Sequence, residues 1–419
     1  MPCRTINHGI KHIAESLIGA TELARNMRTI MSLPSFILAS GIRRWASDMK
    51  IAQVSPLFER VPPAAYGGTE RIISYLTEEL VRRGHELTLF ASGDSVTNAS
   101  LVSPVNVSAR QDMKRQAWLA SYAIQLDQVA ELAHTFDVIH FHTEYMHIPL
   151  AMRLRTPHIT TTHGRLDSPE LVPLYRHFSK CPLVSISDSQ RAPLAHANWC
   201  RTVYHGLPQE LYSISEGAGD YFAFIGRISP EKRVDRAVEI AQRCGKRLYI
   251  AAKVDAFDES YFEGIKHLFK RPGIEFIGEV NDTEKRLLLQ DASALLFPID
   301  WPEPFGLVMI EAFACGTPVV AYRCGAVPEI VQNGVTGFVV NNQEEAITAA
   351  KKIDSIDRRA CRSAFDQRFT AGMMAEHYLQ VYEQISQDFD DYPLRTSHAT
   401  AKGYVIGRSH QGVQFNLAK

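Results

Sequence analysis

Short apolar segments alternate with amphipathic segments along most of the chain. In the first half, an apolar run at 50–57 is followed by a Pro- and Gly-rich loop. Apolar residues at helical spacing then cover 69–84, with Thr69 as the expected N-cap. The pattern predicts the remaining elements of this half as a helix over 116–136, strands over 85–91, 137–143, 157–163 and 182–188, and a closing segment over 202–207. Such alternation is typical of βαβ units with parallel strands.

A polar, glycine-containing segment, residues 213–220, interrupts this rhythm and is the expected domain boundary. The alternation then restarts. We expect strands over 221–227, 247–254, 274–280, 294–299, 318–323 and 337–340, and helices over 234–245, 306–316 and 371–387. The pattern therefore predicts an α/β fold of two tandem doubly wound, Rossmann-like domains. Because ligands bind outside the carboxyl ends of parallel strands, two facing sheets would enclose a central cleft.

These boundaries divide the chain into five expected parts. They are an extension outside the fold (1–48), a first Rossmann-like domain (49–212), a second one (213–370), a C-terminal helix (371–387) and a mobile tail (388–419). Met49 directly precedes the first strand, so residues 1–48 are read either as an appended helix or as residues ahead of a true start at Met49.

Composition narrows the function classes. The net charge of the 419 residues is −1, so no global basic field favours nucleic acid or an anionic membrane. The seven cysteines form no CxxC pair, which argues against a disulfide framework and a structural zinc site and favours a cytoplasmic location. No apolar run reaches the roughly 18–20 residues that a membrane-spanning helix needs.

The segment WPEPFGLVMIEAFACG, residues 301–316, carries the strongest chemical signal. Glu303 precedes a Pro-Phe-Gly turn, and Glu311 lies within an otherwise apolar helix, where an unpaired charge costs several kcal/mol. The helix start offers N–H groups that suit a phosphate, those of Gly306, Leu307 and Val308. Either glutamate alone could be structural, as a favourable acid at a helix start or as a satisfied half-buried carboxylate.

Three weaker signals lie at other strand ends. In FIGRISPEKRVD, Arg227 and Lys232 precede a helix and would suit a diphosphate, although such residues usually form a solvated loop. Gly67 and Gly68 permit close approach of the backbone to a ligand, or form a plain turn. His163 follows a strand and would face the crevice, although a lone histidine is more often structural.

A second group of histidines invites a metal hypothesis. His140 and His142 lie two residues apart on one strand and share a face, with His147 nearby. No carboxylate or cysteine completes a convincing ligand set, so packing or substrate contacts are favoured over a metal. The sequence has no nucleophile elbow, P-loop, HExxH motif or GxGxxG fingerprint.

Taken together, these motifs resemble those of retaining glycosyltransferase family 4, the group 1 glycosyltransferases of GT-B fold. EPFGLVMIE is similar to that family's E-x7-E segment, and GRISPEK is similar to its Gly-Arg…Lys phosphate loop. The segments at 325–340 and 66–90 resemble two further motifs, and all four follow the family's order. The resemblance covers about 49–385.

The resemblance implies roles for individual residues. Arg227 and Lys232 would neutralise the diphosphate of the donor, Glu303 would contact the donor sugar, and Glu311 would hold the ribose. Gly67 and Gly68 would approach the phosphates or the sugar, and His163 would lie beside the transferred sugar. The C-terminal helix would cross back to the first domain.

The resemblance also implies a reaction. A hexosyl group would pass from a UDP- or GDP-sugar to a glycan, lipid-linked or small-molecule acceptor, with retention, without a metal ion and without a cofactor. Peripheral membrane contact would follow from a lipid-linked acceptor. The alternatives are a nucleotide-sugar epimerase or a phosphorylase on the same fold, and a non-catalytic nucleotide-sugar-binding protein.

Overall fold

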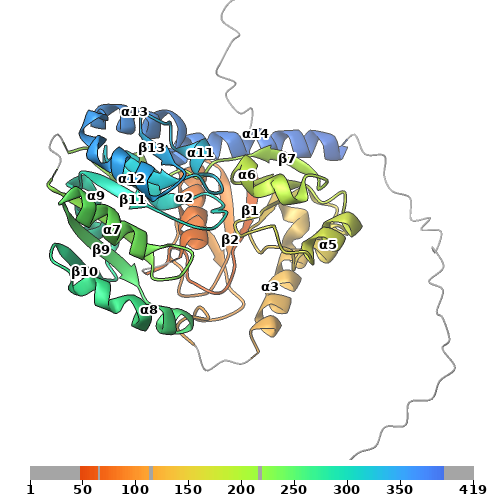
Figure 1. Cartoon of the computed structure of the whole chain (residues 1–419). Coiled ribbons are helices and arrows are strands. Elements are labelled where there is room, and N and C mark those ends of the chain that lie inside the picture. The colour runs from red at the N-terminus through yellow and green to blue at the C-terminus, as the bar shows by residue number, and fades with distance from the viewer. Residues whose placement is uncertain (1–47, 65–66, 113–116, 216–218, 391–419) are drawn as a thin grey trace, which may run out of the picture. The chain divides into compact units, whose positions relative to one another are not determined.

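The computed structural model describes residues 48–64, 67–112, 117–215 and 219–390. Residues 1–47 of the expected extension and 391–419 of the expected tail lie outside this description. The described residues form two parallel sheets with helices around them, which confirms the predicted fold class (Figure 1).

The first domain is built on a seven-stranded sheet in the order β3-β2-β1-β4-β5-β6-β7, with every pair parallel. Its strands are β1 (Lys50–Val54), β2 (Glu86–Phe90), β3 (Ser100–Val102), β4 (Val138–Phe141), β5 (His158–Thr161), β6 (Leu183–Ser185) and β7 (Trp199–Thr202). Its helices are α2 (Gly68–Arg82), α3 (Trp118–Leu132), α4 (Ile148–Ala151), α5 (Leu171–His177) and α6 (Asp188–Arg191). β4 and β5 are buried at every position, as expected for strands covered on both faces.

The second domain repeats this plan with six parallel strands in the order β10-β9-β8-β11-β12-β13. The strands are β8 (Tyr221–Arg227), β9 (Arg247–Lys253), β10 (Ile274–Gly278), β11 (Ala294–Phe297), β12 (Val319–Tyr322) and β13 (Gly337–Val340). The helices are α7 (Val234–Cys244), α8 (Glu259–Ile265), α9 (Asp282–Gln290), α10 (Leu307–Ala314), α11 (Val327–Ile330), α12 (Gln343–Lys351) and α13 (Arg358–Arg368).

In each sheet the strand order reverses beside the first strand, between β1 and β4 and between β8 and β11. Crevices form at such switch points, at the carboxyl ends of the strands. The fold therefore directs the loops after β1, β4, β8 and β11 toward candidate ligand sites.

The last described helix, α14 (Ala371–Asp390), follows the second domain in sequence but packs on the first. Figure 1 shows it running from the side of α13 to the side of β7. Its Tyr378 and Tyr382 are buried, and their hydroxyls bond to Thr161 and His140 of the first sheet, at 3.0 and 2.8 Å.

Several sequence-based boundaries differ from the structure. α2 begins at Gly68 with Gly67 as its N-cap, so Thr69 is not the cap. The segment 202–207 is strand only at Thr202, which ends β7. α14 continues to Asp390, so the expected tail from residue 388 begins within the helix. The connection between β5 and β6 contains a helix, α5, that the pattern did not predict.

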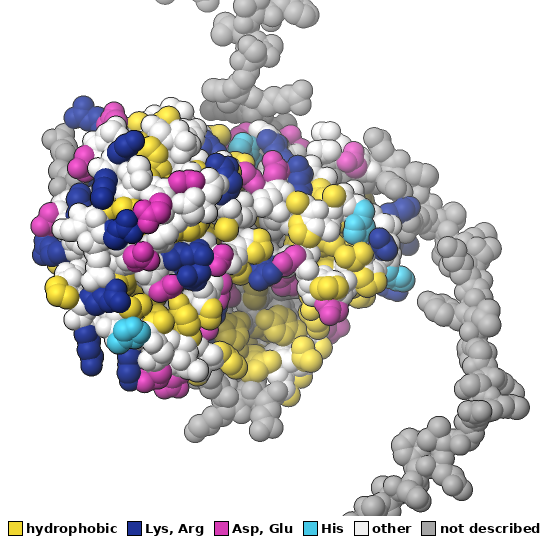
Figure 2. All heavy atoms as spheres, in the orientation of Figure 1, with side chains coloured by type: hydrophobic (Ala, Val, Ile, Leu, Met, Phe, Trp, Pro, Cys, Tyr) yellow, Lys and Arg dark blue, Asp and Glu magenta, His cyan; other side chains and the backbone are white. Residues whose placement is uncertain are grey.

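Within the described residues, no helix combines the length and the apolar character that crossing a membrane would require. On the face drawn in Figure 2, Lys and Arg side chains are interspersed with Asp and Glu, in keeping with the nearly neutral net charge.

Candidate functional site

A pocket of about 680 Å³ is lined by residues of both domains. Arg227 is the last residue of β8, and His163 lies two residues beyond β5, so carboxyl ends of both sheets contribute to its wall. All the site residues predicted from the sequence line this one pocket: Gly67, Gly68, His163, Arg227, Lys232, Glu303, Gly306, Leu307, Val308 and Glu311. The structure thus brings together residues that lie up to 244 positions apart, from Gly67 to Glu311.

Lys232 and Glu303 form an ion pair in the pocket wall. Lys232 Nζ lies 2.5 Å from Glu303 Oε2, and Trp301 Nε1 donates to the same oxygen at 3.0 Å. The ammonium also lies 4.6 Å from the centre of the Trp301 ring, a cation–π contact. The side chains of Lys232 and Glu303 are only 16% and 12% exposed, so solvent screens this pair weakly.

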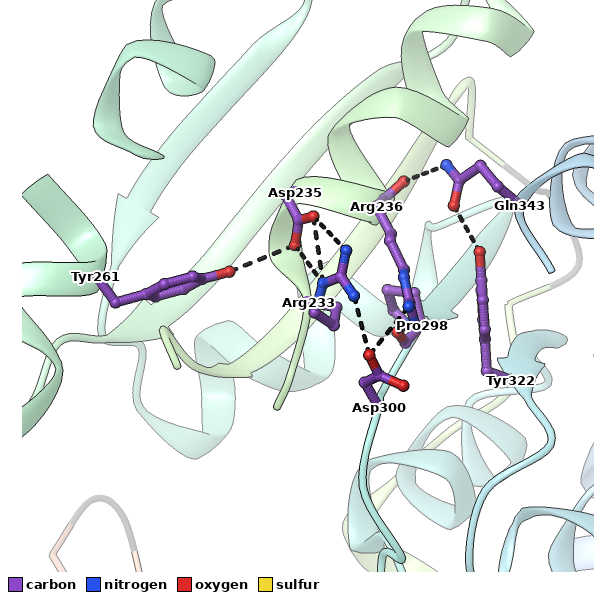
Figure 3. Close-up of polar contacts among 8 residues, drawn as sticks. All are labelled: Arg233, Asp235, Arg236, Tyr261, Pro298, Asp300, Tyr322 and Gln343. Carbon is purple, nitrogen blue, oxygen red and sulfur yellow. Dashed lines mark hydrogen bonds and ion pairs between the residues drawn. The ribbon is translucent and has the colours of Figure 1, made fainter. Parts of the chain in front are cut away.

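A polar network holds the loops that carry this pair (Figure 3). Arg233, directly after Lys232, donates to Asp235 and to Asp300 Oδ2, the latter at 2.9 Å, and Arg236 donates to the same Asp300 oxygen at 3.0 Å. The Asp300 N–H donates to the Glu231 carbonyl at 2.8 Å. The loop before α7 and the loop after β11 are therefore tied together on both sides of Lys232.

The outer part of this network secures the start of α7. Tyr261 donates to Asp235, and Gln343 donates to the carbonyl of Arg236 while accepting from Tyr322. Arg233 itself has a left-handed backbone, with φ 54° and ψ 50°. A non-glycine residue there costs about 1–2 kcal/mol.

Arg227 is surrounded by carboxylates in the structure. Its guanidinium lies 2.5 Å from Glu231, 3.2 Å from Asp258 and 3.8 Å from Asp255. The pKa of Asp258 is raised by burial, which outweighs the attraction of Arg227. An incoming anion would have to compete with these acids for the arginine.

Glu311 is almost fully buried, at 4% exposure, and is paired. Its Oε1 accepts from Lys285 Nζ at 2.5 Å and from the Tyr212 hydroxyl at 3.2 Å. Burial opposes the charge on Lys285, but the carboxylates of Glu311 and Asp282 together outweigh it, and the pKa of Lys285 is raised. The buried charge that the sequence flagged is therefore compensated by a lysine that the sequence did not single out.

Lys285 continues this ion network across the two domains. It lies 3.2 Å from Asp282, which also pairs with Arg71 of α2. Burial works against ionisation of Asp282, but Lys285 and Arg71 lower its pKa overall. A contact between the domains thus lies in the pocket itself.

Two helix starts meet in the wall of the pocket. Gly306, at φ 85°, is the N-cap of α10, and the first helical N–H groups, on Leu307 and Val308, have no partner within the helix. Gly68 opens α2, and a Cβ placed there would lie 3.4 Å from Leu307 Cδ1. At Gly67 a Cβ would lie 2.8 Å from Pro63 Cβ, so only glycine fits.

His163 is held by other histidines. Its Nε2 lies 2.8 Å from His142 Nδ1, and its ring stacks on His205 with centroids 5.4 Å apart. Burial lowers the pKa of His163 to about 3, so the ring is neutral near neutral pH.

The histidines considered for a metal are engaged by protein groups. Both ring nitrogens of His140 bond to Tyr382 and Thr161, and both of His147 bond to Thr143 and Thr160. His142 bonds to Gln53 and His163. These contacts support packing as the role of His140 and His147.

Among the polar residues that sequence reasoning missed are those of the network around Glu311: Arg71, Tyr212, Asp282 and Lys285. A local signal existed for the last two, because Asn281 and Glu284 form a capping box that starts α9. No local signal pointed to Arg71 or Tyr212, whose partners lie 211 and 99 positions away.

Two family models match the chain. The model described as Glycosyltransferase Family 4 matches residues 66–206, and the model described as Glycosyl transferases group 1 matches residues 214–360. Together they cover most of both domains.

Similar proteins match over nearly their whole length. An uncharacterized glycosyltransferase of Methanocaldococcus jannaschii is 26% identical over 81% of this chain and 95% of its own. N-acetyl-alpha-D-glucosaminyl L-malate synthase of Bacillus anthracis is 26% identical over 77% of this chain and 95% of its own.

Solved structures share the fold. AviGT4, a glycosyltransferase involved in avilamycin A biosynthesis, has a TM-score of 0.63 at 23% identity, covering 81% of this chain and 98% of its own. Anabaena HepE in complex with UDP has a TM-score of 0.65 at 19% identity, covering 80% of this chain and all of its own.

Proposed function

The chain belongs to the group 1 glycosyltransferases of the GT-B type, and on this premise we propose that it transfers a hexosyl group from a nucleotide-diphosphate sugar with retention of configuration. The observation that carries the proposal is the meeting of two cations, two glutamates and two helix starts around one pocket. Cations and open N–H groups suit a diphosphate, while carboxylates suit sugar hydroxyls.

In this proposal the second domain binds the donor. Arg227, Lys232 and the first N–H groups of α10 take the diphosphate, Glu303 takes hydroxyls of the sugar, and Glu311 takes the ribose diol. UDP and GDP are the candidate nucleotides. UDP has support from Anabaena HepE, whose solved complexes contain UDP and UDP-glucose.

The ion pairs of the pocket fit such a role. Carboxylates hold both Arg227 and Lys232 in place. A diphosphate carries more charge than one carboxylate and would compete for these cations. Glu303, released in part from Lys232, would then be available to the sugar.

We propose a front-face substitution. The bond from the anomeric carbon to the diphosphate breaks while the acceptor hydroxyl attacks the same face, and the leaving phosphate takes the acceptor's proton. Arg227 and Lys232 stabilise the charge that develops on the phosphate, so the chain's own cations take the role of a metal ion. The acceptor is a glycan, a lipid-linked sugar or a small molecule. The Bacillus anthracis relative, named a synthase of a glucosaminyl malate, gives the small-molecule class a precedent.

The first test is nucleotide binding. The purified chain is melted with UDP, GDP and ADP and with their common sugar conjugates, with and without EDTA. A ligand at 100 times its Kd should stabilise the protein by about 2.7 kcal/mol. One nucleotide giving this shift unchanged by EDTA supports the proposal, and no shift with any of them contradicts it.

The second test is stereochemistry. Product formed from the preferred donor is followed by proton NMR at early times. Retention predicts that the new bond keeps the anomeric configuration of the donor. An inverted product contradicts the mechanism, and an epimerised donor without transfer would instead indicate an epimerase.

A further inference from the structure

A continuous line of hydrogen bonds runs from the pocket wall into the first domain. His163 Nε2 lies 2.8 Å from His142 Nδ1, and His142 Nε2 lies 2.6 Å from Gln53 Oε1. Gln53 Nε2 then donates to the Tyr382 hydroxyl at 3.2 Å. Three links therefore connect a pocket residue to helix α14.

The line continues beyond Tyr382. Its hydroxyl lies 2.8 Å from His140 Nδ1, and His140 Nε2 lies 2.7 Å from Thr161 Oγ1. Thr161 in turn lies 3.0 Å from the hydroxyl of Tyr378. The members deeper than His163 are all buried, at 0–1% exposure: Gln53, His140, His142, Thr161, Tyr378 and Tyr382.

Burial makes the order of donors and acceptors along this line consequential. An unpaired polar group in the interior costs about 1–3 kcal/mol, so each hydrogen must have an acceptor. Burial also lowers the pKa of His140, His142 and His163 far enough that all three rings are neutral near pH 7. Each ring then carries one N–H and one lone pair, and its tautomer depends on its neighbours.

Gln53 determines the direction because its amide has one accepting and one donating end. With its oxygen facing His142 Nε2, that nitrogen carries the hydrogen, and His142 Nδ1 accepts from His163 Nε2–H. The remaining nitrogen, His163 Nδ1, is a lone pair with no partner among the described residues. In the opposite arrangement, His163 Nδ1 would carry a hydrogen with no acceptor. A buried N–H without a partner is rarer than a buried acceptor without one, so His163 also favours the arrangement with the hydrogen on its Nε2.

We propose that Gln53 and Tyr382 are positioning residues that fix the ring orientation of His163 and hold it as the Nε2–H tautomer. Tyr382 holds the amide of Gln53, and Gln53 orients His142, which orients His163. The consequence for catalysis rests on the proposed function, in which His163 lies beside the transferred sugar. The terminal helix thereby acts on the pocket without lining it.

The direct test is histidine NMR of the full-length, ligand-free protein. The chain is labelled with 15N-histidine, and His163 is assigned by loss of its signals in His163→Gln. We expect two well-separated nitrogen shifts in the Nε2–H pattern for His163 in the wild type. In Tyr382→Phe, the amide nitrogen of Gln53 loses its acceptor, so the amide no longer holds His142 in one tautomer. The two nitrogen shifts of His163 should then move toward each other.

A matched control is Tyr175→Phe. Tyr175 is also buried in the first domain, at 1% exposure, but its hydroxyl has no partner among the described residues. This variant should leave the His163 signals unchanged.

If Tyr382→Phe destabilises the fold, Thr161→Val is the second variant. Valine has a shape similar to threonine, and this substitution breaks the line at a more distant link, so it should give a smaller movement of the His163 signals in the same direction. An Nδ1–H pattern for His163 in the wild type overturns the proposal. So do His163 signals that stay unmoved in both Tyr382→Phe and Thr161→Val.

Turnover measurements distinguish the positioning role of Gln53 and Tyr382 from the proposed transferase function. We expect kcat of Tyr382→Phe to fall by on the order of tenfold, below the roughly hundredfold cost of a 1 Å misplacement, with KM for the donor changed little. Equal turnover in Tyr382→Phe and the wild type overturns the proposal while leaving the transferase function intact. A wild type that binds no nucleotide and turns over no donor instead contradicts the proposed function, whereas the NMR result stands independently of it.

Discussion

Lys232 and Glu303 form the closest ion pair between the loop before α7 and the loop after β11. Neither partner is screened well by solvent, so removing one leaves the other buried without compensation, at a cost of several kcal/mol at most. The pair therefore serves stability as well as the proposed donor binding, and single substitutions mix the two effects.

A double-substitution cycle separates them. Lys232→Met and Glu303→Gln should each lower the free energy of unfolding by up to about 3 kcal/mol, and the double variant should lose clearly less than their sum. All three should lose at least about a hundredfold in kcat, because stabilisation of the leaving diphosphate or of the sugar is gone. Urea melts and initial rates with the preferred donor provide the measurements.

The matched control for this cycle is Glu79→Gln. Glu79 is similarly buried, at 10% exposure, and pairs with Arg82 and Arg83 outside the pocket. It should lose stability without losing turnover. Wild-type turnover in Glu303→Gln would show instead that this glutamate is structural.

At the residue scale, the sequence identified the charged residues of the site better than it identified their ion-pair partners. Glu303, Lys232 and Glu311 stood out because charged residues flanked a turn or interrupted an apolar helix. That Glu311 is neutralised by Lys285 could not be predicted, because the two lie on different helices and meet only through the packing of α9 on α10.

At the element scale, the loops before α7 and after β11 act as one unit through Asp300. Asp300 is 53% exposed, so solvent weakens its two arginine contacts and Asp300→Ala should cost no more than about 1 kcal/mol of stability. Its effect on turnover should be larger, on the order of tenfold, because Lys232 and Glu303 would no longer be held in register. Rate measurements on this variant and on Glu344→Ala, which breaks the exposed pair with Arg243, test the expectation. Equal rates in both would contradict it.

Arg233→Gly gives a second measurement on the same loop. Glycine relieves the left-handed backbone strain of about 1–2 kcal/mol but removes the contacts to Asp235 and Asp300. We expect stability close to that of the wild type together with slower turnover. A variant that melts much lower would show that the ion network, rather than loop position, dominates at this residue.

The sequence predicted elements with a continuous apolar pattern, and length alone did not decide which elements were found. β8 and β13 were placed to the residue, and α7 to within one residue, because their apolar pattern is continuous and Gly245 ends the helix. Among the elements that were missed, α5, α11 and β3 contain at most seven residues, which leaves little periodicity to distinguish them from a loop. The longer helices α12 and α13, with nine and eleven residues, were missed as well. α9 is longer, but its signal was its capping box rather than its apolar pattern.

At the scale of the whole molecule, buried neutral histidines make stability depend on pH. Burial lowers the pKa of six histidines, to about 3 for His147 and His163, to about 4 for His158 and well below 6.5 for the others: His140, His142 and His205. The unfolded chain takes up protons below about pH 6.5 that the folded chain does not. The stabilisation is therefore complete above pH 6.5 and is lost progressively as pH falls toward 3.

We expect the melting temperature to fall steadily between pH 7 and pH 5. Each such histidine adds up to about 1.4 kcal/mol of destabilisation per pH unit below its unfolded pKa. Calorimetry in buffers of different ionisation enthalpy should also detect proton uptake on unfolding at pH 5.5. A melting temperature independent of pH over this range would contradict the expectation.

Helix α14 has a consequence for the order in which this protein can mature on the ribosome. The first domain is translated before the second, yet Tyr378 and Tyr382, which complete hydrogen bonds in its interior, follow the whole second domain in the chain. The nascent first domain therefore lacks the partners that Gln53, His140 and Thr161 find on α14 until more than 150 further residues, from Tyr221 to Tyr382, have been made. A fragment ending before Ala371 should remain soluble only with a chaperone, and adding a peptide spanning Ala371–Asp390 should restore its compact state.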